Sequence, residues 1–177
     1  MPPNSLKRIR KVSNVFCWLA RLGLVALASL AIWTLARPDW VAETARLSTQ
    51  GPTTLGPNTQ LALQLTLLIA LIAPAYTLLQ INNLFSFFGQ GKIFGIDPAD
   101  AIRRIGIGLL IMSIFSVASR TAFVVILTFN NPPGQRALSI NLSSDSYGFV
   151  LFGGLFITLG WVLGEAAKLS EENRQFV

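Results

Sequence analysis

The sequence has 177 residues, of which 52% are hydrophobic and only 12% are charged, and its mean hydropathy is +0.56. A water-soluble domain of this length usually carries about twice that share of charged residues. The absence of histidine excludes histidine-based triads and histidine-ligated metals, and the single cysteine excludes internal disulfides and CxxC redox pairs. The composition predicts an integral membrane protein, and we expect neither a metal site nor a cofactor.

The net charge of +6 could indicate a nucleic-acid partner. A nucleic-acid face requires basic residues clustered on a folded surface together with stacking aromatic residues. In this chain the basic residues instead gather just outside apolar runs, which is typical of membrane topology. We therefore expect the lipid bilayer as the principal partner and no direct nucleic-acid binding.

The first apolar run covers residues 12–35 and follows the basic segment NSLKRIRKVSN. A secretory signal peptide also begins with a basic region, but its apolar stretch is only about 7–15 residues long. This run meets that limit only if it is counted from Leu22, so a retained membrane helix is favoured. Arg21 is the only charge in the run, and we expect it to reach toward the cytoplasm, with Glu165 as a partner.

The second membrane span is predicted at residues 61–79, after the loop-forming stretch QGPTTLGPN. Its length is close to the roughly 20 residues that the hydrocarbon core of a bilayer requires. Pro74 lies inside this span. A proline removes one backbone hydrogen bond and should kink the helix, which membrane helices tolerate.

The segment 80–104 contains GQGK, which suggests a phosphate-binding loop. A Walker motif, however, would need a glycine at Ser86 and a hydroxyl residue at Ile93. The segment is better explained as a cytoplasmic hairpin in which glycines allow the turn. We expect Asp97 to be the N-cap of the following helix, with Pro98 at its first position.

The third and fourth spans are predicted at residues 105–129 and 147–166, and a polar tail occupies 167–177. The N-terminal segment, the hairpin 80–104 and the tail together contain nine Lys and Arg residues. The other two loops contain three. Because cytoplasmic loops carry the excess of positive charge, both termini and the hairpin are predicted to be cytoplasmic. The fold prediction is an all-α, multi-pass four-helix bundle forming one domain in a bacterial inner membrane.

Arg120 lies about fifteen residues into the third span, roughly 22 Å along the helix. Ser113 and Ser116 share its helical face, so this face should look into the bundle. One interpretation is an intramembrane polar site for a ligand or an ion. The other is that Arg120 extends toward the outer surface, where Asp145 could pair with it.

Small residues predict close helix packing. The sequence GWVLG from Gly160 to Gly164 has the spacing of a GxxxG motif, and such faces let helices approach closely in lipid. The motif could serve packing within the chain, which we favour, or a homo-oligomer. The second span carries a similar small face, formed by Thr66, Ala70, Ala73 and Thr77.

The stretch LFSFFGQGKIFGIDPADAIRRIGIGLL resembles the central signature of bacterial membrane proteins catalogued as domain of unknown function 2975. The residues that carry the resemblance are Gly91, Lys92, Ile93, Phe94, Arg103, Arg104, Ile105 and Gly106, and in the tail Leu169, Glu171 and Glu172. The resemblance implies four membrane helices and no established activity. Members are often encoded beside helix-turn-helix regulators, which implies that they tether or inhibit a regulator.

We expect no enzymatic activity, because the only acidic residue in the predicted spans is Glu165, at a cytoplasmic edge. The working hypothesis is a regulatory or scaffolding role, with the two family-like segments forming one cytoplasmic docking surface. The alternative is a small transporter or channel component that uses the polar face of Arg120, Ser113 and Ser116. The expected docking residues are Lys92, Phe94, Arg103, Arg104, Glu171 and Glu172.

Overall fold

The structure is a computed structural model that describes residues 3–41, 43, 57–93, 95–129, 138, 140 and 143–175. Its elements within these residues are all helical. They are α1 (Pro3–Ala36), α3 (Pro57–Ala70), α4 (Ile72–Gly89), α5 (Ile96–Thr128) and α6 (Ser144–Gln175). The expected all-α class is confirmed for this part of the chain.

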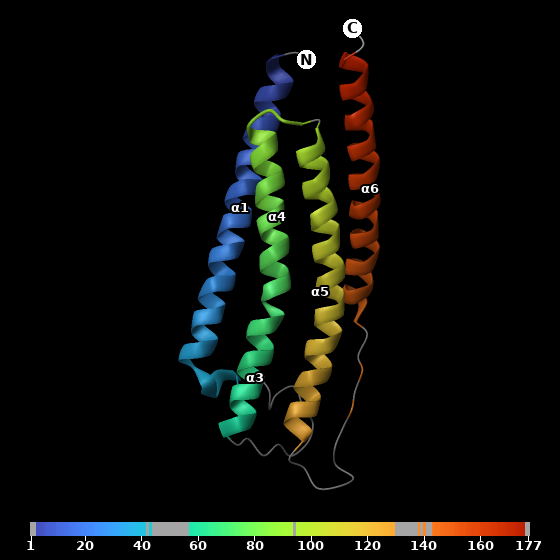
Figure 1. The fold of residues 1–177 in the computed structure, drawn as a ribbon. Helices are drawn as coiled ribbons and strands as arrows, with labels where there is room; N and C mark the ends of the chain where they lie inside the picture. Colours follow the sequence, from blue (N-terminus) through green and yellow to red (C-terminus); the bar gives the residue numbers. More distant parts are fainter. Residues whose placement is uncertain are drawn as a thin grey trace.

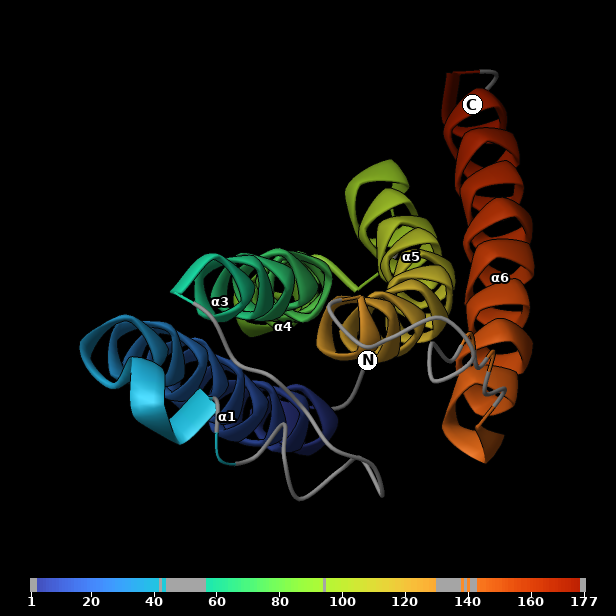
Figure 2. The ribbon, with the colours of Figure 1, turned by 90° about the horizontal axis from the view of Figure 1, so that it is seen from below.

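The helices stand side by side in a row, in the order α1, α3 with α4, α5 and α6 (Figures 1 and 2). The main packing joins α5 to α6, α1 to α4, and α4 to α5. The expected four-helix bundle is therefore an open one, with α1 and α6 at its two flanks. Within the part of the chain that the structure describes, four helical segments are long and apolar enough to cross a membrane: Lys7–Ala36, Asn58–Gly89, Ile96–Thr128 and Ser144–Glu172.

The segment Asn58–Gly89 is broken in the middle, where α3 ends and α4 begins. Pro74 has no N–H group to donate to the carbonyl of Ala70, so the regular hydrogen-bond ladder is interrupted there. The chain adapts at Leu71, whose N–H lies 3.2 Å from the carbonyl oxygens of both Leu67 and Leu68. The kink expected at Pro74 is confirmed.

The turn between α4 and α5 occupies only residues 90–95, so most of the segment expected as a hairpin is helical. Gly91 has a φ of 83°, which favours glycine, and the N–H of Lys92 donates to the carbonyl of Phe87 at 3.0 Å. The expectations for Asp97 and Pro98 were wrong: the N-cap of α5 is Gly95 and the helix begins at Ile96, so Asp97 is its second residue and Pro98 its third. Gly95 takes this role because its backbone is extended, whereas a helical residue cannot be an N-cap.

The α4–α5 turn, the start of α1 and the end of α6 lie at the same end of the molecule, which we name the hairpin end (Figure 1). A small buried cluster lies toward this end, formed by Leu84, Ala101 and Ile105. A second lies at the opposite end, formed by Val41, Leu63 and Leu127. Large apolar side chains elsewhere are mostly exposed; Trp18 is 65% exposed and Ile114 is 68% exposed. Such an extensive apolar surface is typical of helices that face lipid.

Candidate functional site: a groove at the hairpin end

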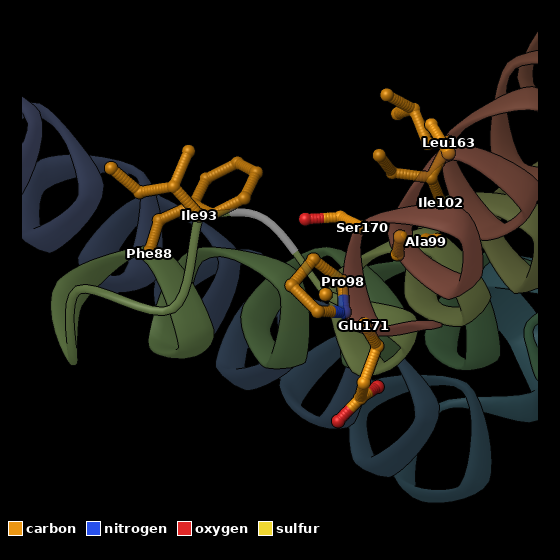
Figure 3. Close-up of a pocket in the computed structure, with 11 residues that line it drawn as sticks. Phe88, Ile93, Pro98, Ala99, Ile102, Leu163, Ser170 and Glu171 are labelled. Carbon is orange, nitrogen blue, oxygen red and sulfur yellow. The ribbon is translucent and has the colours of Figure 1, made fainter. Parts of the chain in front are cut away.

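A mostly apolar groove of about 610 Å³ lies at the hairpin end, between the α4–α5 turn and the last turns of α6 (Figure 3). One wall is formed by Phe88 and Ile93, which come from the end of α4 and from the turn. The other wall includes Ile102 of α5 and Leu163 of α6. The groove thus joins two segments that are some seventy residues apart in the sequence.

The polar groups of the groove come from α6. The hydroxyl group of Ser170 points into the space between the walls, and Glu171 lies at the edge (Figure 3). Pro98, close to the start of α5, forms part of the floor and is buried. An apolar groove with a carboxylate at one edge can bind the apolar face of a ligand, and the carboxylate can pair with a positively charged group of the same ligand.

The structure brings only some of the expected docking residues to this groove. Glu171 lines it, while Lys92 and Glu172 are exposed nearby, each next to a lining residue. Arg104 is exposed on α5, and Phe94 lies outside the described residues. Several apolar lining residues, above all Ile93 and Pro98, were not among the expected docking residues, because their position beside α6 is seen only in the fold.

Arg103 serves the packing of α5 rather than the groove. Its guanidinium pairs with Asp100 at 3.3 Å, and its backbone lies directly against Gly160 of α6. A Cβ atom placed on Gly160 would be 2.8 Å from the nitrogen of Arg103, so only glycine allows this approach. Gly160 therefore packs within the chain, and a homo-oligomer through Gly160 and Gly164 would compete with this contact.

The polar face around Arg120 forms a junction between α5 and the start of α6. Ser113 donates a hydrogen bond to the carbonyl of Ser146 at 3.0 Å, and the hydroxyl oxygens of Ser116 and Ser146 are 2.8 Å apart. Arg120 pairs with Asp145 at 3.9 Å, as one of the two interpretations predicted, and both side chains are more than half exposed. No buried side-chain nitrogen or oxygen atom in the described part of the chain lacks a hydrogen-bond partner. This face therefore connects two helices, and the hydroxyl groups of Ser113 and Ser116 form their hydrogen bonds within the chain.

The seam between α1 and α4 also carries polar contacts. Arg21 donates from Nε to the side-chain oxygen of Asn82 at 3.3 Å, and Arg10 donates to the carbonyl of Gly89 at 3.0 Å. The expected pair of Arg21 with Glu165 is wrong, because α1 and α6 lie on opposite flanks of the row; Glu165 pairs with Lys168 at 3.4 Å.

The described residues contain no group of three or more acidic, cysteine or histidine side chains that could hold a metal ion. No protein-family model, curated protein or solved structure matches the chain. The resemblance to domain of unknown function 2975 therefore stays a prediction.

Proposed function

We propose that this chain is a non-enzymatic, multi-pass protein of the bacterial inner membrane. In this proposal the groove at its hairpin end docks an amphipathic segment of a cytosolic protein. The observation that carries the proposal is the groove itself, because the turn after α4 and the tail of α6 form its walls. These are the two segments that resemble the domain of unknown function 2975, whose genomic setting suggests a helix-turn-helix regulator as the docked protein.

The depth of the helices in the bilayer is best argued from α6. Between Asp145 and Glu165 it has 19 residues without charge, Ser146 to Gly164, or about 28 Å of helix. This length matches the hydrocarbon core of a bilayer. Since Arg120 pairs with Asp145, it belongs at the outer edge of this core rather than deep inside it. The last turns of α5 then extend beyond the core, where Phe123 packs against the cluster of Leu63 and Leu127.

The orientation is argued from charge. At the hairpin end the structure describes eight Lys and Arg side chains: Lys7, Arg8, Arg10, Lys11, Lys92, Arg103, Arg104 and Lys168. Toward the opposite end it describes two, Arg37 and Arg120. The excess of positive charge favours a cytoplasmic hairpin end, which would expose the groove to cytosolic proteins.

The chemistry of the groove defines its occupant. The walls of Phe88, Ile93 and Leu163 fit the apolar face of a short helix, as in other helix-in-groove complexes. Glu171 and Glu172 are exposed on α6 and favour a basic residue at the adjoining edge of that helix. We therefore propose a partner helix with apolar residues on one face and Lys or Arg beside them.

The proposal is tested by photo-crosslinking in native membranes, with a crosslinking amino acid at Ile93. We expect the captured peptide, identified by mass spectrometry, to be an amphipathic cytosolic segment with basic residues. The substitution Glu171→Lys should lower the yield by roughly tenfold, since it places like charges together. Glu165→Lys is the matched control, because it reverses a charge on the same helix at a residue that does not line the groove. Equal yields from Glu171→Lys and the unaltered chain, or no cytosolic peptide at all, would contradict the proposal.

A further inference from the structure

Arg21 is the one charged residue in the long apolar part of α1. It follows Lys11 by ten residues, about 15 Å along the helix, and the next charge after it is Arg37. With the membrane placement proposed above, on which this inference rests, Arg21 belongs inside the cytoplasmic half of the bilayer. A guanidinium at that depth needs hydrogen-bond acceptors and a counter-charge.

The described part of the chain supplies an acceptor but no counter-charge. Nε of Arg21 donates to the amide oxygen of Asn82, which is neutral, at 3.3 Å. The carboxylates that form ion pairs are taken by other residues: Asp100 by Arg103, Asp145 by Arg120 and Glu165 by Lys168. Arg21 thus differs from Arg120, which has a carboxylate partner on a neighbouring helix.

The surroundings of Arg21 are open on one side and polar along the seam. Its side chain is exposed, and α1 stands at the flank of the row, where none of the other described helices covers its outer side (Figure 2). Arg10 lies three turns earlier on the same face of α1, and Asn14 between them faces Gly89 of α4. Long side chains on a helix point toward its N-terminus, so the guanidinium of Arg21 is directed toward the hairpin end.

We infer that Arg21 and Asn82 form a binding site for the phosphate group of an anionic phospholipid in the cytoplasmic leaflet. The guanidinium keeps its terminal N–H groups for the phosphate, and such groups bind phosphate oxygens in a bidentate manner. The amide oxygen of Asn82 orients the guanidinium by accepting the hydrogen bond from Nε of Arg21. Arg10 adds a second positive charge closer to the membrane surface, where basic residues attract anionic lipids.

The test measures which lipids stay bound to the purified protein. The chain is reconstituted in bilayers of equal parts phosphatidylglycerol and phosphatidylcholine, extracted gently and analysed by native mass spectrometry. We expect the unaltered chain to retain phosphatidylglycerol in preference, by roughly tenfold. Arg21→Gln should reduce this preference to about twofold or less. Arg21→Lys keeps the positive charge but loses the planar set of N–H donors, so it should give an intermediate value. Arg120→Gln is the matched control and should leave the preference unchanged.

The outcomes separate this site from the proposals on which it rests. Flotation of the reconstituted vesicles on a density gradient shows whether the chain is bound to the bilayer. If the chain does not float with the vesicles, the membrane placement is wrong and the lipid site is wrong with it. If the chain floats but Arg21→Gln retains as much phosphatidylglycerol as the unaltered chain, only the lipid site is overturned. Inorganic phosphate that displaces the lipid at millimolar concentration would indicate a soluble anion as the ligand and would also overturn it. Should Arg21→Gln fail to fold, Asn82→Leu must lower the preference, because it removes the group that orients Arg21.

Discussion

The seam between α5 and α6 and the seam between α1 and α4 are built differently, although both are antiparallel pairs of long apolar helices. In the α5–α6 seam, Gly106, Gly153 and Gly160 bring the two backbones into direct contact. In the α1–α4 seam, Gly23 meets only the flexible side chain of Leu78, and polar groups such as Asn82 lie between the helices. Arg120 of the α5–α6 seam has a carboxylate partner on the neighbouring helix, whereas Arg10 and Arg21 of the α1–α4 seam form no ion pair within the described residues.

This difference indicates a division of roles. A seam formed by backbone contact cannot be widened without losing most of its van der Waals contacts, so α5 and α6 should behave as one rigid pair. This rigidity matters for the groove, because its floor is on α5 and one wall is on α6. The α1–α4 seam contains polar side chains that can exchange partners, which suits a site for lipid. Substitutions in the α5–α6 seam test this difference between the two seams.

Gly106→Leu should have the largest effect, because it destroys the α5–α6 contact. A Cβ at this position would lie 2.6 Å from the carbonyl oxygen of Gly153 and 2.7 Å from the nitrogen of Ile157, and neither backbone atom can move alone. We expect a loss of about 3 kcal/mol of stability or a failure to fold, as judged by thermal unfolding in detergent. Gly154→Leu is the control, since a Cβ there meets no atom within 4 Å. Equal stability of the two variants would show that the helices do not pack as described.

Ser113→Ala should have an intermediate effect, because it removes the hydrogen bond to the carbonyl of Ser146. Ser113 is buried, and a hydrogen bond of this kind contributes about 1 kcal/mol. Ser119→Ala is the matched control on the same helix, since its hydroxyl bonds only within α5, to the carbonyl of Ser116. Thermal unfolding of both variants measures the difference. If Ser119→Ala were the more destabilising, the proposed junction between α5 and α6 would be wrong.

Arg120→Gln should have the smallest effect. Arg120 and Asp145 are 52% and 75% exposed, and an ion pair between such side chains contributes on the order of 0.5 kcal/mol. A double-mutant cycle with Asp145→Asn isolates the pair, and its coupling should decrease in high salt. A coupling of several kcal/mol would instead mean that the pair lies in the hydrocarbon core, contrary to the placement at its edge.

Local features of this fold could be predicted from the sequence. Pro74 had to interrupt its helix because it lacks an N–H group, and Gly160 lay in a motif of small residues that favours close packing. The pairing of Arg120 with Asp145 was one of two predicted alternatives, since Arg120 precedes and Asp145 follows the same polar loop. For Pro74 and Gly160 the determining residues belong to one helix, and the helices of Arg120 and Asp145 are consecutive in the chain.

The lateral order of the helices could not be predicted in this way. Apolar runs define which segments are long enough to span a membrane, but every such helix has several faces that could accept a neighbour. For this reason the prediction that Arg21 pairs with Glu165 was wrong. The row of helices separates α1 from α6, and Arg21 contacts Asn82 of α4 instead. The depth of Arg120 in the bilayer depends on the register between α5 and α6. This register is seen in the contacts that Gly106 and Ser113 make with α6. The wall of the groove that includes Ile102 of α5 and Leu163 of α6 depends on the same register.

The most direct test of the membrane placement is cysteine labelling in intact bacterial cells with a membrane-impermeant maleimide, in a Cys17→Ala background. Ile114, Phe129 and Leu169 are all more than half exposed, so burial within the protein cannot explain a difference in their labelling. Such a difference must come from cover by lipid or from the side of the membrane on which the residue lies. We predict that Phe129→Cys is labelled in intact cells, Leu169→Cys only after permeabilisation, and Ile114→Cys in neither case. Labelling of Leu169→Cys in intact cells, or of Ile114→Cys in any condition, would contradict the account.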